Sequence, residues 1–276
     1  MSPKKIAAPG LAGQLAVKPG STVHLKDWDP AATFGWTKDT AATRTAEDLV
    51  RLASLQERIW AERRHPVLVV LQGIDAAGKD GTIGHVMTAL NPQGAPVTGF
   101  GVPTSTELAH DYLWRAHSAM PRKGEIGIFN RSYYEDVLVV RVHNLVPKQV
   151  WTRRFGQIND FERMLAQEGT TVVKFFLLID HDEQRRRLQA RYDDPTKRWK
   201  FKMTDLDERK LWDDYMTAFQ DALGRCSTDT APWYVIPANR KWFRNLAVSE
   251  ILVDRLEALK PAYPISADLP PDLVIE

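Results

Sequence analysis

The stretch VLVVLQGIDAAGKDGT, residues 67–82, constrains the fold of this chain more than any other part of the sequence. It begins with a near-continuous apolar run at 67–72, which is typical of a strand buried on both faces of a sheet. Gly73, Gly78 and Lys79 then match the phosphate-loop template of Gly, four residues, Gly and Lys. Such a loop joins a buried strand to a helix whose N-terminus faces an anion. The stretch therefore predicts an α/β protein that binds phosphate groups.

Two carboxylates make this loop unusual. Asp80 occupies the last template position, where a Ser or Thr hydroxyl normally binds magnesium, and Asp75 lies within the loop. In a partly dry site, a carboxylate and a neighbouring phosphate repel each other by about several kcal/mol unless a cation lies between them. Mg²⁺ binds carboxylate and phosphate oxygens together, so Asp75 is predicted to hold Mg²⁺. Asp80 is equally well explained as an acid in the first turn of a helix. Thr82 comes two residues too late for the usual hydroxyl ligand, although it could contact phosphate.

Short apolar runs alternate with helical patterns along the rest of the chain. This alternation predicts right-handed crossovers and a parallel sheet that is covered by helices on both faces. The further strands are expected at 97–100, 125–130, 171–179 and 233–237, and the helices at about 79–90, 106–119, 147–167, 182–192, 205–224 and 243–259.

The chain has 276 residues, of which 43% are hydrophobic, and this is enough for one or two domains with a buried core. We expect an irregular N-terminal arm at 1–45, which is rich in Pro, Gly, Ala and Thr, then a domain at 46–260 and a tail at 261–276. One cysteine, Cys226, excludes an internal disulfide. With no good secretion signal and no apolar run of about 20 residues, a cytoplasmic protein is expected.

A second group of candidate residues follows the predicted strand at 125–130. Asn130 and Arg131 lie where many phosphate-loop enzymes carry an Asp that holds magnesium through water. Asn is a weaker, neutral ligand, whereas Arg131 is well placed for a phosphate at the carboxyl end of a strand. The alternative is a capping Asn and a surface Arg. Asp136 and Arg141 follow on a predicted helix, and either could instead pack in a salt bridge.

The third feature is a basic segment at 185–202, which has eight basic and two acidic residues. Arg187 and Arg191 are four residues apart and share a helix face, and Arg198 and Lys200 follow after a break at DDPTKRW. Two basic helices joined by a turn predict a lid over a phosphate-rich substrate at about 183–212. Alternatively, the basic segment could bind nucleic acid, or it could simply be a charged helix face exposed to solvent. The basic segment contains few aromatic residues and the whole chain has a net charge of only +2, and both features argue against nucleic-acid binding.

Taken together, five stretches resemble the polyphosphate kinase 2 family. They are GIDAAGKDGT, FNRSYYEDVLVVRV, RLQARYDDPTKRWKF, DERKLWDDYMTAF and APWYVIPANRKWFRNL, and the similarity runs from about residue 17 to residue 260. The resemblance implies a three-layer, thymidylate-kinase-like phosphate-loop kinase fold with a helical lid. It also implies Mg²⁺-assisted transfer of a terminal phosphoryl group between inorganic polyphosphate and a nucleotide. Asn130, in place of the usual Asp, resembles the branch that accepts both nucleoside monophosphates and diphosphates.

The resemblance also implies roles for individual residues. Lys79 and Arg131 would stabilise the transferring group, and Asp75, with Asn130, would hold Mg²⁺. The predicted substrate contacts are Gly73, Ala76, Ala77, Gly78, Asp80, Gly81, Thr82, Asn130, Arg141, Arg187, Arg191, Arg198 and Lys200. The expected partners are polyphosphate, AMP, ADP and ATP, with no nucleic acid or membrane partner, and aromatic residues favour a homo-oligomer.

Two other functions fit parts of the sequence. An ATP-dependent nucleoside monophosphate kinase would normally have Ser or Thr after Lys79, and it would not need so basic a lid. A non-catalytic protein could use the same loop and helices to bind nucleotides or nucleic acid.

Overall fold

The protein is represented by a computed structural model that describes residues 10–265 and 274–275. Its centre is a sheet of five parallel strands in the order β2-β3-β1-β4-β5. This arrangement confirms the predicted α/β fold with a parallel sheet. The strands are β1 (Val67–Gln72), β2 (Val97–Gly99), β3 (Ile126–Asn130), β4 (Thr171–Leu178) and β5 (Trp233–Pro237).

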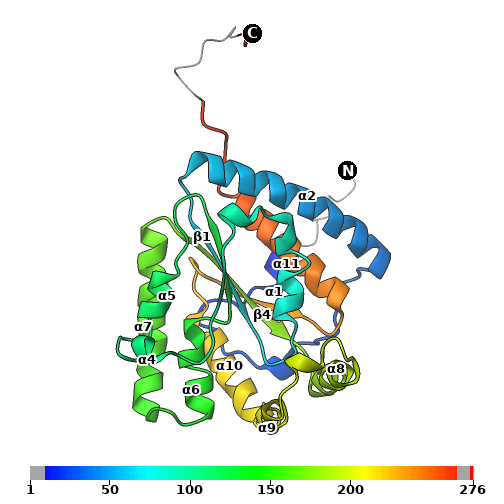
Figure 1. The fold of residues 1–276 in the computed structure, drawn as a ribbon, viewed down its shortest axis with the longest axis vertical. Coiled ribbons are helices and arrows are strands. Elements are labelled where there is room, and N and C mark those ends of the chain that lie inside the picture. Colours follow the sequence, from blue (N-terminus) through cyan, green and yellow to red (C-terminus); the bar gives the residue numbers. More distant parts are fainter. Residues whose placement is uncertain (1–9, 266–273, 276) are drawn as a thin grey trace, which may run out of the picture.

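Helices cover both faces of the sheet and give the predicted three layers (Figure 1). Side chains alternate between the two faces of a strand, and β4 shows which helices lie on which side. Lys174 and Phe176 point toward one layer, where they contact Glu162 and Phe219. That layer contains α7 (Lys148–Gln167) and α10 (Trp212–Cys226), and the other layer contains α2 (Lys38–Glu62) and α11 (Lys241–Glu257).

Lys174 is a charged residue in the middle of this buried strand. Its side chain is fully buried, and Nζ lies 2.5 Å from Glu162 Oε2. Nζ also donates hydrogen bonds to Tyr134 Oη at 2.9 Å and to the carbonyl oxygen of Cys226 at 2.7 Å. Because a buried charge is tolerated only when it is paired and hydrogen-bonded, this network ties the segment after β3 to β4, α7 and α10.

Three helical patterns are shorter or more broken in the structure than the sequence predicts. The pattern at 106–119 forms two short helices because the Asp111 carboxylate accepts a hydrogen bond of 2.9 Å from Leu113 N, which stabilises a turn between them. The remaining helices are α3 (Lys79–Ile83), α4 (Ser105–Leu108), α5 (Trp114–Ser118), α6 (Val139–Val142), α8 (His181–Asp193) and α9 (Thr204–Lys210). Short 3-10 turns lie at Leu25–Asp27, Met87–Ala89, Pro92–Gly94, Tyr133–Asp136 and Arg198–Lys200.

The described part of the N-terminal arm is more ordered than the expected irregular segment. Helix α1 (Leu11–Leu15) buries both of its leucines, and Ala16 forms an antiparallel bridge with Tyr234 of β5. Helix α2 begins at Lys38, before the predicted start at residue 46, because Thr37 and Thr40 form a capping box. Packing against β5 and α11, rather than local periodicity, therefore decides the structure of this segment. Residues 1–9 of the arm, and residues 266–273 and 276 of the predicted tail, lie outside the described residues.

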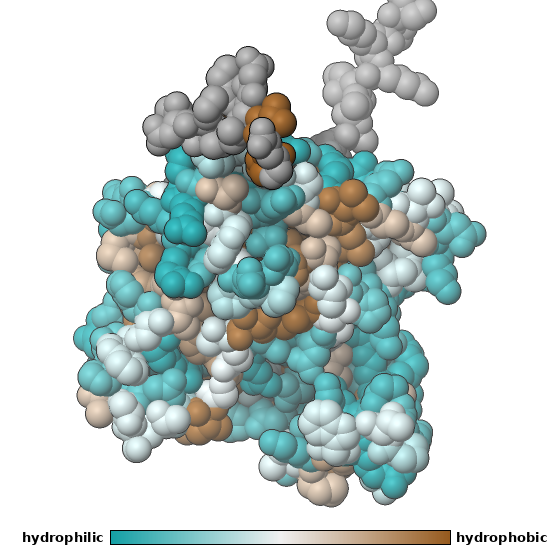
Figure 2. Space-filling view, turned by 45° about the horizontal axis from the view of Figure 1, so that its top comes forward, coloured by the Kyte–Doolittle hydropathy of each residue, from teal (hydrophilic) through white to brown (hydrophobic). Residues whose placement is uncertain are grey.

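The surface is mixed in character. Figure 2 shows a largely hydrophilic face on which hydrophobic residues form a band across the middle. Within the described residues, no helix combines the length and apolar character needed to cross a membrane. The homo-oligomer stays a prediction.

Candidate active site

The phosphate loop lies between β1 and α3, at the carboxyl edge of the sheet. Gly73 has φ +155° and Gly78 has φ +112°, which are conformations that favour glycine. A Cβ atom on Gly73 would also lie 2.9 Å from the carbonyl oxygen of Leu177 on β4. Ala76 has φ +65°, in the left-handed region. The glycines of the template are thus required by the turn and by its close approach to the next strand.

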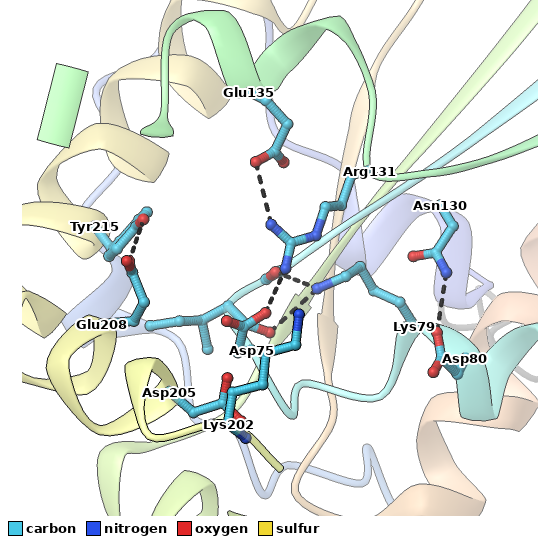
Figure 3. Close-up of polar contacts among 12 residues, drawn as sticks. Asp75, Lys79, Asp80, Asn130, Arg131, Glu135, Lys202, Asp205, Glu208 and Tyr215 are labelled. Atoms are coloured by element: carbon cyan, nitrogen blue, oxygen red, sulfur yellow. Dashed lines mark hydrogen bonds and ion pairs between the residues drawn. The ribbon is translucent and has the colours of Figure 1, made fainter. Parts of the chain in front are cut away.

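Lys79 is folded over the loop, as Figure 3 shows. Its Nζ donates hydrogen bonds to the carbonyl oxygens of Gly73 at 2.6 Å and Ile74 at 3.3 Å. Burial, followed by the nearby positive charge of Arg131, lowers the pKa of Lys79 to about 8. A bound phosphate would add negative charge next to the ammonium and favour its charged form. The pKa of Lys79 should therefore rise when phosphate binds.

Arg131 connects the end of β3 to the phosphate loop. Its Nη2 donates to Asp75 Oδ1 at 2.5 Å, and its Nη1 donates to Glu135 Oε2 at 3.4 Å (Figure 3). The residue has φ +64°, so the chain turns sharply directly after the strand. The structure therefore brings together the three predicted catalytic residues, Asp75, Lys79 and Arg131, around one loop.

Asp80 joins the loop to β3 and to Lys200 of the predicted lid. Asn130 Nδ2 donates to Asp80 Oδ1 at 2.9 Å, and Lys200 Nζ lies 3.3 Å from Asp80 Oδ2. Partial burial acts to raise the pKa of Asp80, but the hydrogen bonds from Asn130 and Lys200 outweigh it and lower this pKa. Asp80 is therefore a negatively charged carboxylate that contacts both Asn130 and Lys200.

The predicted metal ligands fit magnesium only together with a phosphate ligand. Asp75 and Asp80 both line the cavity described below, and carboxylate oxygens are ligands that Mg²⁺ prefers. Asn130 is hydrogen-bonded to Asp80, not to Asp75. Among the described residues, no cluster of three or more His, Cys, Asp or Glu side chains could enclose a metal ion. Mg²⁺ often binds through one or two carboxylates, with phosphate oxygens and water completing its shell, and Asp75 suits that arrangement.

An open cavity of about 1090 Å³ lies over the loop, between the ends of the strands, the lid and the first turn of α11. Its lining contains most of the predicted site residues. These are Asp75, Ala76, Gly78, Lys79, Asp80, Gly81, Asn130, Arg131, Arg187, Arg191 and Lys200.

Three loop residues that were predicted to contact substrate support the loop instead of lining this cavity. Thr82 is buried, and its hydroxyl donates to the carbonyl oxygen of Gly78 at 3.1 Å. The carbonyl oxygen of Gly73 accepts from Lys79, and that of Ala77 accepts from Arg187.

Two predicted arginines also lie outside the cavity lining. Arg141 donates to Asp221 Oδ2 at 2.6 Å and lies over the ring of Trp151, so it joins α6 to α10 and α7. This matches the alternative of a packed salt bridge. Arg198 donates from Nε to the carbonyl oxygen of Tyr192 at 2.7 Å. Neither residue therefore lines the cavity where substrate contacts were predicted.

The base of the predicted lid is fastened to the phosphate loop. Arg187 donates to the carbonyl oxygens of Ala76 at 3.0 Å and Ala77 at 2.8 Å, and also to that of Ala238. Gln184 donates to the carbonyl oxygen of Asp75 at 3.1 Å. Arg187 was predicted to bind phosphate, but much of its guanidinium is already hydrogen-bonded to backbone carbonyl oxygens of the protein.

The outer part of the lid keeps more of its cations directed at the cavity. Arg191 lies 3.7 Å from Asp205 Oδ2, and its side chain is 26% exposed. Lys197, Lys200 and Lys202 also line the cavity. Within α8, Gln184 and Arg187 are thus fixed to the loop, whereas the later cations of the basic segment that line the cavity can contact a ligand there.

Sequence reasoning missed several cavity residues on α11. Lys241, Arg244 and Asn245 all line the cavity, and Arg244 lies next to the loop. A signal for Lys241 exists in the sequence NRK at 239–241, because it directly follows the strand predicted at 233–237 and ligands bind at the carboxyl ends of such strands. Nothing in the sequence singled out Arg244, because one Arg in a helix with many apolar residues looks like an ordinary surface residue.

Comparisons with known proteins agree with this geometry. The polyphosphate kinase 2 family profile matches residues 35–264. The AMP/ADP-polyphosphate phosphotransferase of Meiothermus ruber is 56% identical over 262 residues, which are 94% of this chain and 98% of that protein. The ADP-polyphosphate phosphotransferase of Rhodopseudomonas palustris is 43% identical, with 91% of each chain covered.

A solved structure is similar over nearly the whole chain as well. The crystal structure of polyphosphate kinase 2 from Arthrobacter aurescens superimposes with a TM-score of 0.90 and 44% sequence identity, and the match covers 95% of this chain and 94% of that one. Family profile, relatives and fold lead to the same conclusion, and the chain belongs to the polyphosphate kinase 2 family.

Proposed function

We propose that this protein transfers a phosphoryl group between inorganic polyphosphate and AMP or ADP, with Mg²⁺ as cofactor. The observation that carries the proposal is the concentration of cations around one phosphate loop. Lys79 and Arg131 lie at the loop, and further basic residues from the lid and α11 line the same cavity. One triphosphate would not need so many charges, whereas polyphosphate carries about one charge per phosphate unit along its length.

The reaction requires little covalent chemistry from the protein. An oxygen of the terminal nucleotide phosphate attacks the terminal phosphorus of polyphosphate, and the bond from that phosphorus to the bridging oxygen breaks. The shortened polyphosphate leaves with the bonding electron pair, so the transfer is balanced without water or a redox partner. Such a transfer is accelerated mainly by positioning and by neutralising charge on the transferring group. Lys79 and Arg131 would supply that positive charge, and Asp75 would hold Mg²⁺.

The names of two relatives support the choice of acceptor. The Meiothermus ruber relative is named for AMP and ADP, and the Rhodopseudomonas palustris relative for ADP. Asn130 adds no negative charge of its own next to Asp80. A neutral side chain there is compatible with acceptors of different charge, because ADP carries more negative charge than AMP.

We infer a cytoplasmic enzyme, since one cysteine in 276 residues fits a reducing compartment. We also infer a homo-oligomer, for which the hydrophobic band of Figure 2 offers a surface.

One assay tests the activity. Purified protein is incubated with Mg²⁺, polyphosphate and either AMP or ADP, and the formation of ADP and ATP is followed over time. Parallel reactions omit polyphosphate, contain a chelator, or supply ATP as the donor to AMP. ATP formation that requires both polyphosphate and Mg²⁺ is the expected result. Transfer from ATP to AMP, without any use of polyphosphate, would instead identify an ATP-dependent monophosphate kinase.

A further inference from the structure

Arg244, in the first turn of α11, lies against the beginning of α3. Its side chain is buried, with only 2% of the residue exposed, yet it lines the cavity. A Cβ atom on Gly81 would lie 3.2 Å from Arg244 Nη2 and 3.3 Å from Nη1. A Cβ atom on Gly78 would collide with Nη1. The guanidinium thus covers Gly78 of the loop and Gly81 of α3, and side chains at these positions would displace or crowd it.

The positive charge of Arg244 is not balanced by the protein. Its Nε and Nη2 both donate to Asn245 Oδ1, at 3.1 and 2.7 Å, and this acceptor is a neutral amide. Within the described part of the chain, Arg244 forms no ion pair with a carboxylate. Burial and the nearby Arg187 lower the pKa of Arg244 to about 10. A buried cation without a counter-ion is costly to the fold, and a ligand anion would relieve that cost.

The residues around Arg244 indicate which anion fits. Lys241, Arg186 and Arg191 contribute further positive charge to the same part of the cavity. The one carboxylate among the lining residues of α8, Glu183, is paired with Arg186 at 3.0 Å and with Arg187 at 2.7 Å. The lining residues of α8 and α11 include no aromatic side chain on which a base could stack. This wall therefore suits a chain of phosphates better than a nucleoside.

We propose that Arg244 binds the polyphosphate chain directly, at a phosphate beside the loop, and that Gly78 and Gly81 leave the space its guanidinium needs. The inference rests on the proposed function and names one residue of the polyphosphate site. It also explains Gly81, which lies within α3 and has no left-handed φ that would require glycine.

The first test replaces Arg244 and measures binding to polyphosphate of defined length in the absence of nucleotide. Arg244→Met should weaken this binding about tenfold or more, because a hydrogen bond between charged groups is lost. The KM for ADP should change less than twofold. Arg163→Met is the matched control, since Arg163 is exposed on α7 and pairs only with Asp160 among the described residues. Unchanged affinity for polyphosphate, or a loss confined to ADP, would overturn the inference.

A double-variant cycle tests the proposed geometry and does not depend on the stability of one variant. Gly81→Ala crowds the guanidinium, so it should weaken polyphosphate binding in the wild-type background. In an Arg244→Met background the same change should cost little more. Independent, additive losses would show that Gly81 and Arg244 do not act through each other. If Arg244→Met fails to fold, Arg244→Lys, alone and with Gly81→Ala, gives the same comparison.

The outcomes separate this inference from the proposed function. If the wild-type protein neither binds polyphosphate nor uses it as a donor, the proposed function fails and the inference fails with it. If the wild-type protein makes ATP from polyphosphate and Arg244→Met retains the same polyphosphate affinity, the inference alone fails.

Discussion

Arg131 and Asp75 form an ion pair across the phosphate loop, with Nη2 of the guanidinium 2.5 Å from Oδ1 of the carboxylate. Arg131 is the candidate phosphate ligand and Asp75 the candidate magnesium ligand. Their contact keeps opposite charges side by side at the place where Mg²⁺ and phosphate would have to meet. The pair is only partly exposed, with 37% and 30% of the two side chains accessible, so its attraction is weakly screened.

We expect Asp75→Asn to abolish most activity, because the change preserves the shape of the side chain but removes the charge that would hold Mg²⁺. Turnover should fall about a hundredfold or more, and added Mg²⁺ should recover only part of it. The measurement is kcat over a range of Mg²⁺ concentrations. Asp75 would be a structural turn residue if the variant bound polyphosphate and turned over normally at every concentration.

Lys79→Ala should lower turnover about a hundredfold or more, since one preorganised charge at the transition state is lost. The variant should still fold, although two carbonyl oxygens of the loop lose a donor, and thermal unfolding measures the loss of stability. Near-normal turnover of a folded variant would remove the loop lysine from the mechanism.

The lowered pKa of Lys79 predicts how activity depends on pH. The free enzyme should lose the positive charge of Lys79 as the pH rises through about 8, so kcat/KM for polyphosphate should decline above that pH. Bound phosphate would raise this pKa, and kcat should therefore hold to a higher pH than kcat/KM. Profiles that decline together, or a kcat/KM that stays constant to pH 10, would contradict this assignment.

The lowered pKa of Lys79 also predicts how the stability of the folded protein changes with pH. Between about pH 8 and the ordinary pKa of 10.5, the unfolded chain keeps a proton on Lys79 that the folded protein has released. Unfolding then takes up a proton, so the contribution of Lys79 to the free energy of unfolding becomes more favourable to the fold as pH rises through this window. Denaturant unfolding of wild type and Lys79→Met over this pH range would reveal the difference.

The sheet and the loop could be predicted because each is encoded by a short, continuous stretch of sequence. Residues 67–72 form β1 as expected, and all six are buried, since the run is apolar without alternation. The positions of Lys79 and Arg131 beside the loop were predictable in the same way, from a template and from the end of a strand, while their roles stay predictions. The polyphosphate kinase 2 resemblance added the fold family, and the matching profile and relatives confirm it.

The rest depends on contacts between distant segments. Arg187 looks like a lid cation in sequence, but its guanidinium bonds to carbonyl oxygens that the fold brings near it, more than 100 residues earlier in the chain. Arg244 reaches the loop only because α11 follows β5 and passes over Gly78. Periodicity and composition carry no information on such pairings.

Arg187 and Arg191 should therefore behave differently when each is replaced by Ala. Both changes should reduce activity, but only Arg187→Ala should also lower the melting temperature, because it leaves the carbonyl oxygens of Ala76 and Ala77 without a donor. The loss in Arg191→Ala should be largest at low salt, since partly exposed charges are screened within roughly 8–10 Å. Thermal unfolding and kinetics at two ionic strengths measure this, with Arg163→Ala as the exposed control. Unaltered kinetics in both variants would make the basic segment a solvated face.

Asn130→Asp should change the choice between AMP and ADP. Asn130 Nδ2 lies 2.9 Å from Asp80 Oδ1, so the substitution places a second carboxylate where a hydrogen-bond donor now lies. Two such charges about 4 Å apart repel by about 4 kcal/mol at an effective dielectric constant near 20, before solvent screening. The added charge would either repel the acceptor phosphates or recruit another Mg²⁺.

Either result should alter the ratio of kcat/KM for AMP to that for ADP, measured with polyphosphate as donor, more than it alters the melting temperature. The reason is that ADP brings more negative charge than AMP to the same place. Asn130→Ala is the control, because it removes the hydrogen bond to Asp80 without adding charge. An Asn130→Asp ratio equal to that of wild type would mean that acceptor choice is set elsewhere. The predicted lid is then the best candidate, since Lys200 Nζ lies 3.3 Å from the same Asp80 carboxylate.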